Sequence, residues 1–410
     1  MTPTRRRLIG AALAAATVPV ASMIPGRARA QARQTIRIGV LNDQSGPWRD
    51  LSGPTSVACA RQAIAEFAAL DFDVELLIGD HRNTLERATA IARGWFAQDG
   101  VDMVLDGGAS PCALALAEIC HENNKVLITT SAASDALTGP ACQGTTVQWV
   151  YDTAMQARST AGALARAGGK SWFLLVPDNP VGKTLAQETA DAVAEAGGQL
   201  IGSATLGDGT TDFGAVLRQA QASKAMVLGI CSAGPAVADC LKQAHAMGLQ
   251  KTMTLAPLIL FSTQVHEIGL EIAQGTRLSE AFYWNLNGRT RSFIARVSGK
   301  VTLWPNMIQA GAYAATLHYL KAAQNVGTAE AKVDGASVVA RMKAMPTDDD
   351  CFGSGSIRAD GRKLHPAVMF EAKAPAESQH EWDLLKPLAV TTAESAVRPL
   401  QDGGCPLIKA

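Results

Sequence analysis

The sequence predicts an α/β protein of two lobes, each built around a parallel sheet. Short apolar runs recur along the chain, and most are followed by a helical pattern. These strand-to-helix units repeat at intervals of about 25 to 45 residues, which is the spacing of βαβ units. The chain has 410 residues, about twice the usual length of one domain once an N-terminal signal is set aside. We therefore expect two such lobes.

The expected strands are rich in Val, Ile and Leu, and they are continuous rather than alternating, as in strands that are buried on both faces. Helical spacing is clearest after Ser56 and after Asn83, where apolar residues recur every three or four positions. In such sheets ligands bind beyond the carboxyl ends of the strands. The expected strands are 36–41, 74–78, 101–105, 126–130, 172–176, 200–205 and 225–230.

Residues 1–30 have the pattern of an export signal. Thr4–Ile9 is a basic segment of twin-arginine type, an uncharged stretch continues to Ile24, and Ala28-Arg29-Ala30 is a small-x-small cleavage site. The uncharged stretch is shorter than the roughly 20 strongly apolar residues that span a bilayer. We expect cleavage near Ala30, a periplasmic location and a mature protein that is not embedded in the membrane.

Charge and cysteine content exclude several classes of function. The signal carries five arginines and no acid, so residues 31–410 hold 32 basic and 37 acidic residues. Nucleic acid is then an improbable partner, because no basic excess exists to displace phosphate counterions. Eight cysteines are too few for a disulfide scaffold in a chain of this length.

No complete catalytic, nucleotide or metal motif is visible. Val181–Thr184 ends like a phosphate-binding loop, but Pro177 stands where that loop needs its first glycine. Gly229–Gly234 resembles a nucleophile elbow, yet Ala233 replaces its second glycine. The seven histidines show no zinc-binding spacing. We therefore expect no enzyme activity, no cofactor and no metal.

Several segments in order along the chain resemble one family. They include Ile38–Pro47 (IGVLNDQSGP), Gly79–Asn83, Trp149–Asp152, Ser279–Asn285 and Ile357–Arg362. Together they are similar to the periplasmic solute-binding proteins of ABC importers, in the branched-chain amino acid (Leu/Ile/Val) class with the type I periplasmic binding protein fold. The resemblance implies two Rossmann-like lobes, joined by three crossover segments, that close on a small ligand.

The resemblance also implies where the chain divides. We expect the signal at 1–30, the first lobe at 31–148 plus 279–347, the second lobe at 149–278 plus 348–380, and a tail, 381–410, that returns to the first lobe. The chain changes character at Thr145–Asp152, near Leu255–Phe261 and at Thr347–Phe352. We interpret these three segments as the crossovers.

By the same resemblance the ligand site takes loops from both lobes. Ser110 and Ser131 are expected to donate hydroxyl hydrogen bonds to a ligand carboxylate, as at any anion site near a helix N-terminus. Phe282 and Trp284 are expected to form an apolar wall. The full set of expected ligand-binding residues is Ser110, Ser131, Ala132, Ala133, Ser134, Tyr151, Val181, Ser232, Ala233, Phe282 and Trp284.

Cys142 and Cys405 lie in turn-rich segments, and the family often has a similar bridge, so we expect a disulfide between them. The other six cysteines are expected to stay reduced.

The identity of the ligand is open between an amino acid, an amide and an aliphatic or aromatic carboxylate. Asp152 and Glu280 are the possible partners of a ligand ammonium, and both are equally plausible as surface groups. The expected partners are the small ligand and the permease subunits of an ABC importer, with the protein itself a monomer. The alternatives are a periplasmic sensor subunit of the same fold and an exported enzyme.

Overall fold

The computed structural model describes residues 33–67, 71–207 and 209–409. The predicted export signal lies outside the described residues. Within the described part of the chain, no helix is both long and apolar enough to cross a membrane.

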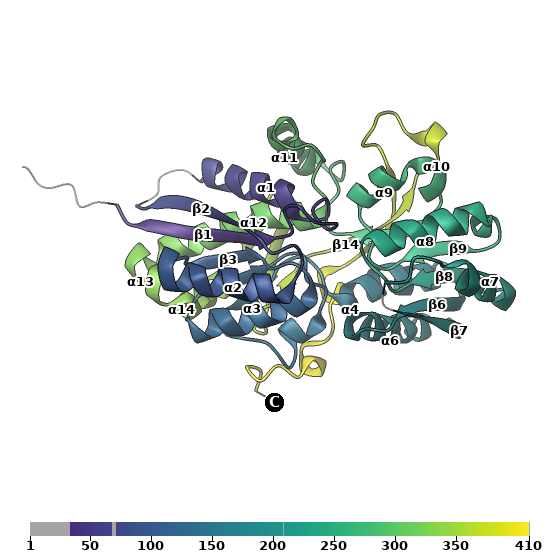
Figure 1. Ribbon diagram of the computed structural model, residues 1–410, viewed down its shortest axis with the longest axis horizontal. Helices are drawn as coiled ribbons and strands as arrows, with labels where there is room; N and C mark the ends of the chain where they lie inside the picture. The colour runs from purple at the N-terminus through teal and green to yellow at the C-terminus, as the bar shows by residue number, and fades with distance from the viewer. Residues whose placement is uncertain (1–32, 68–70, 208, 410) are drawn as a thin grey trace, which may run out of the picture. The chain divides into compact units, whose positions relative to one another are not determined.

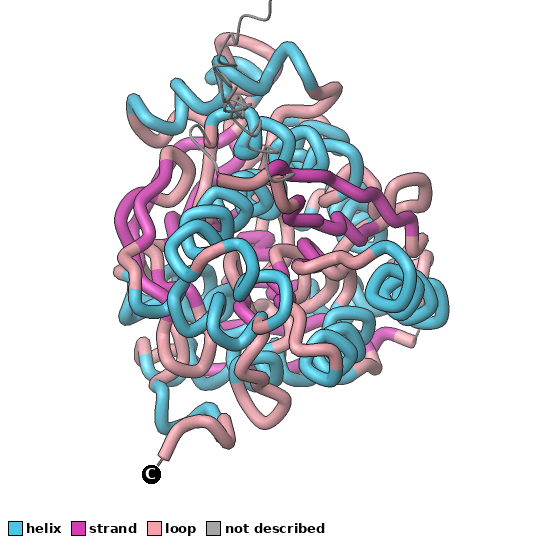
Figure 2. The backbone as a smooth tube through the Cα atoms, turned by 90° about the vertical axis from the view of Figure 1, so that its left-hand side faces the viewer, coloured by secondary structure: helices cyan, strands magenta, loops and turns pink. Residues whose placement is uncertain are grey.

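The first lobe is built on a five-stranded parallel sheet of order β2-β1-β3-β4-β5. Alternate side chains of one strand enter different cores: Met103 and Leu105 face α1 and α12, whereas Val104 faces α3. Helices accordingly lie on both faces of the sheet (Figures 1 and 2). The strands are β1 (Thr35–Asn42), β2 (Asp73–Asp80), β3 (Met103–Asp106), β4 (Val126–Thr129) and β5 (Thr146–Gln148).

The helices of the first lobe form two groups. α1 (Gly53–Glu66), α12 (Met307–Val326), α13 (Thr328–Val333) and α14 (Gly335–Ala344) pack together. On the other face of the sheet, α2 (Leu85–Gly94), continued by the π-helix Trp95–Asp99, packs against α3 (Ser110–Glu122).

The second lobe repeats this plan with a four-stranded parallel sheet of order β7-β6-β8-β9. Its strands are β6 (Ser171–Pro177), β7 (Gln199–Leu206), β8 (Val227–Ile230) and β9 (Thr254–Pro257). One face is covered by α6 (Pro180–Glu195) and by the continuous helical segment α4 (Thr153–Gln156), η3 (Ala157–Gly162) and α5 (Ala163–Arg166). The other is covered by α7 (Gly214–Ser223) and α8 (Pro235–Ala246). All seven expected strands are present, so the predicted fold class is confirmed.

Antiparallel strands complete the structure. β10 (Arg277–Glu280), β14 (Ala367–Ala372) and β15 (Leu385–Thr391) form one sheet, and β10 contacts β9. β11 (Thr347–Asp349), β12 (Gly353–Ile357) and β13 (Lys363–Leu364) form another, and β12 contacts α14. The remaining α-helices are α9 (Ser262–Ile268), α10 (Leu270–Ala273) and α11 (Gly288–Val297), which precede α12, and α15 (Ala393–Ala396) in the tail.

These pairings correct the expected boundaries. Residues 347–364 lie with the first lobe, although 348–380 was assigned to the second. β15, assigned to the tail on the first lobe, pairs instead with β14. The segment 255–261, expected to be a crossover, instead contains most of β9. Only the short helices α9 and α10 follow β9, so the sequence lacks the long helical pattern that identified the other strands.

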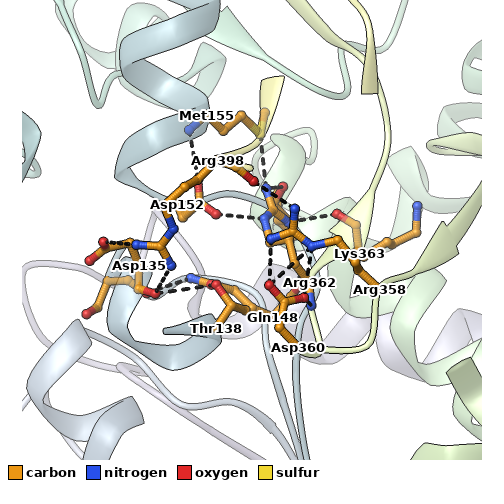
Figure 3. Close-up of polar contacts among 12 residues, drawn as sticks. Asp135, Thr138, Gln148, Asp152, Met155, Arg358, Asp360, Arg362, Lys363 and Arg398 are labelled. Carbon is orange, nitrogen blue, oxygen red and sulfur yellow. Dashed lines mark hydrogen bonds and ion pairs between the residues drawn. The ribbon is translucent and has the colours of Figure 1, made fainter. Parts of the chain in front are cut away.

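The first crossover, residues 149–152, is fixed by the buried side chain of Arg362 (Figure 3). Arg362 donates to Asp152 Oδ2 at 2.8 Å and to the Val150 carbonyl at 3.2 Å. Asp152 also accepts the N–H of Met155 at 2.7 Å, which starts α4. The pair therefore sets the direction in which the chain enters the second lobe.

Cys142 and Cys405 form a disulfide, which ties the tail to the first lobe. The other six cysteines are buried and free. Near the disulfide, Arg398 of the tail pairs with Asp135 at 2.6 Å, so the tail is held by a second contact (Figure 3).

Candidate ligand-binding site

A cavity of about 1000 Å³ lies where the carboxyl ends of both parallel sheets meet. The first lobe contributes the segments after β1, β3 and β4, and the second contributes those after β6, β7 and β8. This is the position at which open parallel sheets bind ligands.

Ser110 is one of the polar side chains that the first lobe contributes to the cavity. It begins α3, lines the cavity and is 6% exposed. Its oxygen accepts the N–H of Ser134 at 3.1 Å. Its own proton has no acceptor among the described residues, so the hydroxyl is free to donate to a bound group.

Ser131 also lines the cavity, but its hydroxyl is engaged within the protein. It donates to Asp106 Oδ1 and lies 3.0 Å from the Gly108 carbonyl. Asp106 is fully buried, and its other oxygen accepts from Asn42 Nδ2 at 2.8 Å. A serine hydroxyl has one proton to donate, and in Ser131 that proton is used within the protein. Ser131 therefore holds the loop in place and does not make the expected donation to a ligand.

Tyr151 lies on the first crossover and lines the cavity. Its hydroxyl donates to the Ser131 carbonyl at 2.8 Å, and its ring meets Phe261 edge-on with centroids 5.4 Å apart. Burial raises the pKa of Tyr151 above its usual value, so the phenol stays protonated. Tyr151 can offer a ligand its ring and an acceptor oxygen.

The second lobe contributes the first turns of two helices. Val181 lies in the first turn of α6, which Asn179 caps by accepting the N–H of Gly182 at 2.9 Å. Ala236 lies in the first turn of α8. Cys231 and Ser232, which follow β8 and precede α8 in the chain, also line the cavity. Burial raises the pKa of the Cys231 thiol to about 12, so it is not a nucleophilic thiolate.

Trp48 reaches from the first lobe to Gly234 of the second. A Cβ on Gly234 would lie 2.5 Å from Trp48 Cη2, and the φ of Gly234 is +66°, a conformation that favours glycine. Trp48 lines the cavity and was not among the expected site residues, although it directly follows the motif Ile38–Pro47. A bulky aromatic residue after Gly-Pro at a strand end was the signal that could have identified it.

The structure brings together eight of the eleven expected residues. Ala132 is buried beneath the loop and does not line the cavity. Phe282 is fully buried and packs on Phe293 with centroids 5.7 Å apart. Trp284 packs on Trp304 and donates to the Trp382 carbonyl at 2.7 Å, away from the cavity. Those lining it are Ser110, Ser131, Ala133, Ser134, Tyr151, Val181, Ser232 and Ala233.

The two carboxylates considered as ammonium partners are also buried elsewhere. Asp152 pairs with Arg362, and Glu280 accepts the N–H groups that begin α9 and α12. Burial raises the pKa of Glu280 to about 8. Neither residue lines the cavity.

A model of the family described as periplasmic binding protein matches residues 35–379. A periplasmic binding protein from Burkholderia mallei is 35% identical, with a TM-score of 0.84 over 92% of this chain and 100% of that one. A branched chain amino acid ABC transporter periplasmic ligand-binding protein from Burkholderia xenovorans LB400 is 33% identical, with a TM-score of 0.84 over 91% and 99%.

More distant structures share the fold. An ABC transporter solute-binding protein from R. palustris, solved in complex with benzoate, is 16% identical, with a TM-score of 0.77 over 88% of this chain and 97% of that one. No protein with a curated description matches the sequence. The family match covers most of the chain, so this protein belongs to the periplasmic binding proteins.

Proposed function

We propose that this protein is a periplasmic solute-binding protein, which captures a small organic ligand between its two lobes and delivers it to an ABC importer. The observation that carries the proposal is the cavity of about 1000 Å³ lined by strand-end loops of both lobes. It is supported by membership of the family and by the ABC transporter relative that is 33% identical. Contacts made only when the lobes are shut shift the protein toward its closed state.

In this proposal the protein is a monomer without enzyme activity, and residues 1–30 are removed on export by the twin-arginine route. The absence of an activated nucleophile at Cys231 supports a binding role. Mass spectrometry of the periplasmic protein gives the cleavage site, and light scattering gives the mass of the particle. A start at Met1 or a stable dimer would contradict these details.

A thermal-shift screen of amino acids, amides and organic acids tests the function. A ligand present at about 100 times its Kd stabilises the folded protein by about 2.7 kcal/mol. Uptake of the hit is then measured in cells with and without the gene. Unchanged uptake together with a lost transcriptional or chemotactic response would favour a sensor subunit instead.

A further inference from the structure

We infer that His81 is a positioning residue for the ligand site: through Asn83 it holds the loop Gly108–Ser110, which lines the cavity, although His81 itself does not line it. The inference rests on the proposed function, because it concerns one wall of that same site.

The His81 ring uses one nitrogen and leaves the other without a partner. His81 directly follows β2 and is fully buried. Its Nδ1 accepts the N–H of Asn83 at 2.8 Å, which only a neutral ring can do, and burial lowers the pKa of His81 below its usual value. The proton therefore lies on Nε2, which is buried without a hydrogen-bond partner among the described residues. A buried donor without an acceptor is unfavourable, so we expect this ring to do more than fill space.

The N–H that His81 accepts belongs to a turn with an unusual backbone. Arg82 and Asn83 both have positive φ, of 48° and 55°, a conformation that is uncommon outside glycine. Asp80 supports the turn by accepting the N–H of Arg82 at 3.1 Å, and His81 supports it by accepting the next N–H. Such conformations persist only where the surrounding contacts enforce them, and they concentrate at binding sites.

The turn directs the Asn83 side chain to the start of α3. Asn83 Oδ1 accepts the N–H of Ala109, the residue that precedes α3, at 3.0 Å. His81 also approaches this loop directly, since a Cβ on Gly108 would lie 2.2 Å from His81 Nε2. Gly108, Ala109 and Ser110 all line the cavity. The position of this wall therefore depends on a side chain that lies behind it.

Four variants separate the Nδ1 acceptor from the bulk of the ring. In His81→Asn the side-chain oxygen can accept the same N–H, because Asn commonly bonds the backbone N–H two residues on, whereas His81→Leu keeps bulk without an acceptor. Asn83→Gly tolerates the positive φ but removes the acceptor for Ala109. Arg82→Gly is the matched control in the same turn, since the Arg82 guanidinium pairs with Asp80 at 3.5 Å.

Two measurements are made on each variant. Hydrogen exchange of the Ala109 amide, followed by NMR, reports the loop without a ligand, and calorimetry reports the Kd of the tightest binder among leucine, acetamide and benzoate. We expect His81→Leu and Asn83→Gly to exchange faster and to bind more weakly by roughly two- to tenfold, the effect of one neutral hydrogen bond. His81→Asn and Arg82→Gly should stay within about twofold of the parent. NMR of isotope-labelled histidine nitrogens should show the Nε2–H tautomer for His81, assigned by the signal that His81→Asn loses.

Several results would overturn the inference. These are parental exchange and affinity in Asn83→Gly, an Nδ1–H tautomer for His81, or a loss in His81→Asn as large as in His81→Leu, which would mean that the ring only fills space. If His81→Leu does not fold, the contrast of Asn83→Gly with Arg82→Gly and His81→Asn decides. Absence of binding by all three compounds to the parent would count against the proposed function, and the exchange rates would still decide the inference.

Discussion

The two serines of the first-lobe loops are expected to behave differently when each is changed to alanine. Ser131→Ala removes a donor from Asp106, a fully buried carboxylate that then keeps only Asn42 Nδ2 of its two side-chain donors. A hydrogen bond to a charged group contributes about 1.5 to 3 kcal/mol. We therefore expect the unfolding free energy to fall by that amount, and the ligand affinity to change less than it does in Ser110→Ala.

Ser110→Ala should give the opposite balance. It removes an acceptor from the Ser134 N–H, a neutral hydrogen bond worth about 0.5 to 1.5 kcal/mol. It also removes a hydroxyl that faces the cavity and is expected to donate to a ligand carboxylate, so affinity should fall roughly ten- to a hundredfold.

Urea unfolding gives the stability of each variant and calorimetry gives its Kd. Ser232→Ala is the matched control, because Ser232 lines the cavity without a hydrogen bond to any described residue. Its unfolding free energy should stay within about 0.5 kcal/mol of the parent. A Ser131→Ala variant of parental stability that binds ligand tenfold more weakly would refute the assignment, because its hydroxyl would then serve the ligand and not Asp106.

Three further changes test other parts of the structure. Replacing Cys142 and Cys405 by serine should lower the unfolding free energy by up to about 5 kcal/mol, since the bridge joins residues 263 apart; a parent whose urea midpoint is indifferent to reductant would contradict this. Gly234→Ala should weaken ligand binding by pushing Trp48 away, whereas Gly269→Ala, also at positive φ but with nothing within 4 Å, should affect stability alone; equal Kd values in both would disprove the contact. Burial raises the pKa of Glu280 from 4.5 to about 8, so the folded state holds this proton more tightly than the unfolded state does. The unfolding free energy should therefore fall as the pH rises between those values. Glu280→Gln should reduce that fall, as measured by urea unfolding at pH 5 and pH 8.

The strands and their order as βαβ units could be predicted because each apolar run is local. The inner strands β1, β3 and β8 are largely buried, whereas the edge strands β2 and β7 are partly exposed. The loops after β3, β4, β6 and β8 could then be placed at one edge, which located most of the site. The resemblance to the family placed Phe282 and Trp284 at the site, but neither lines the cavity. Trp284 instead donates to the carbonyl of Trp382, which lies 98 residues further along the chain, so no local pattern could show its environment.

Long-range pairing also explains the errors in the lobe boundaries. β10 ends at Glu280, and its partner β14 begins at Ala367, so no local pattern relates the two. The contact between Arg398 and Asp135 spans 263 residues and brings the tail to the wall of the cavity. Composition and periodicity carry no signal of such contacts.

The acids near the cleft show why the ligand class could not be settled from the sequence. Asp106, Asp152 and Glu280 each stand at or beside a strand end, where a ligand-binding carboxylate would also stand. In the structure each one holds the protein together: Asp106 anchors Ser131, Asp152 joins Arg362 to the start of α4, and Glu280 begins α9 and α12. Because these three carboxylates build the walls of the cleft, none of them lines the described cavity.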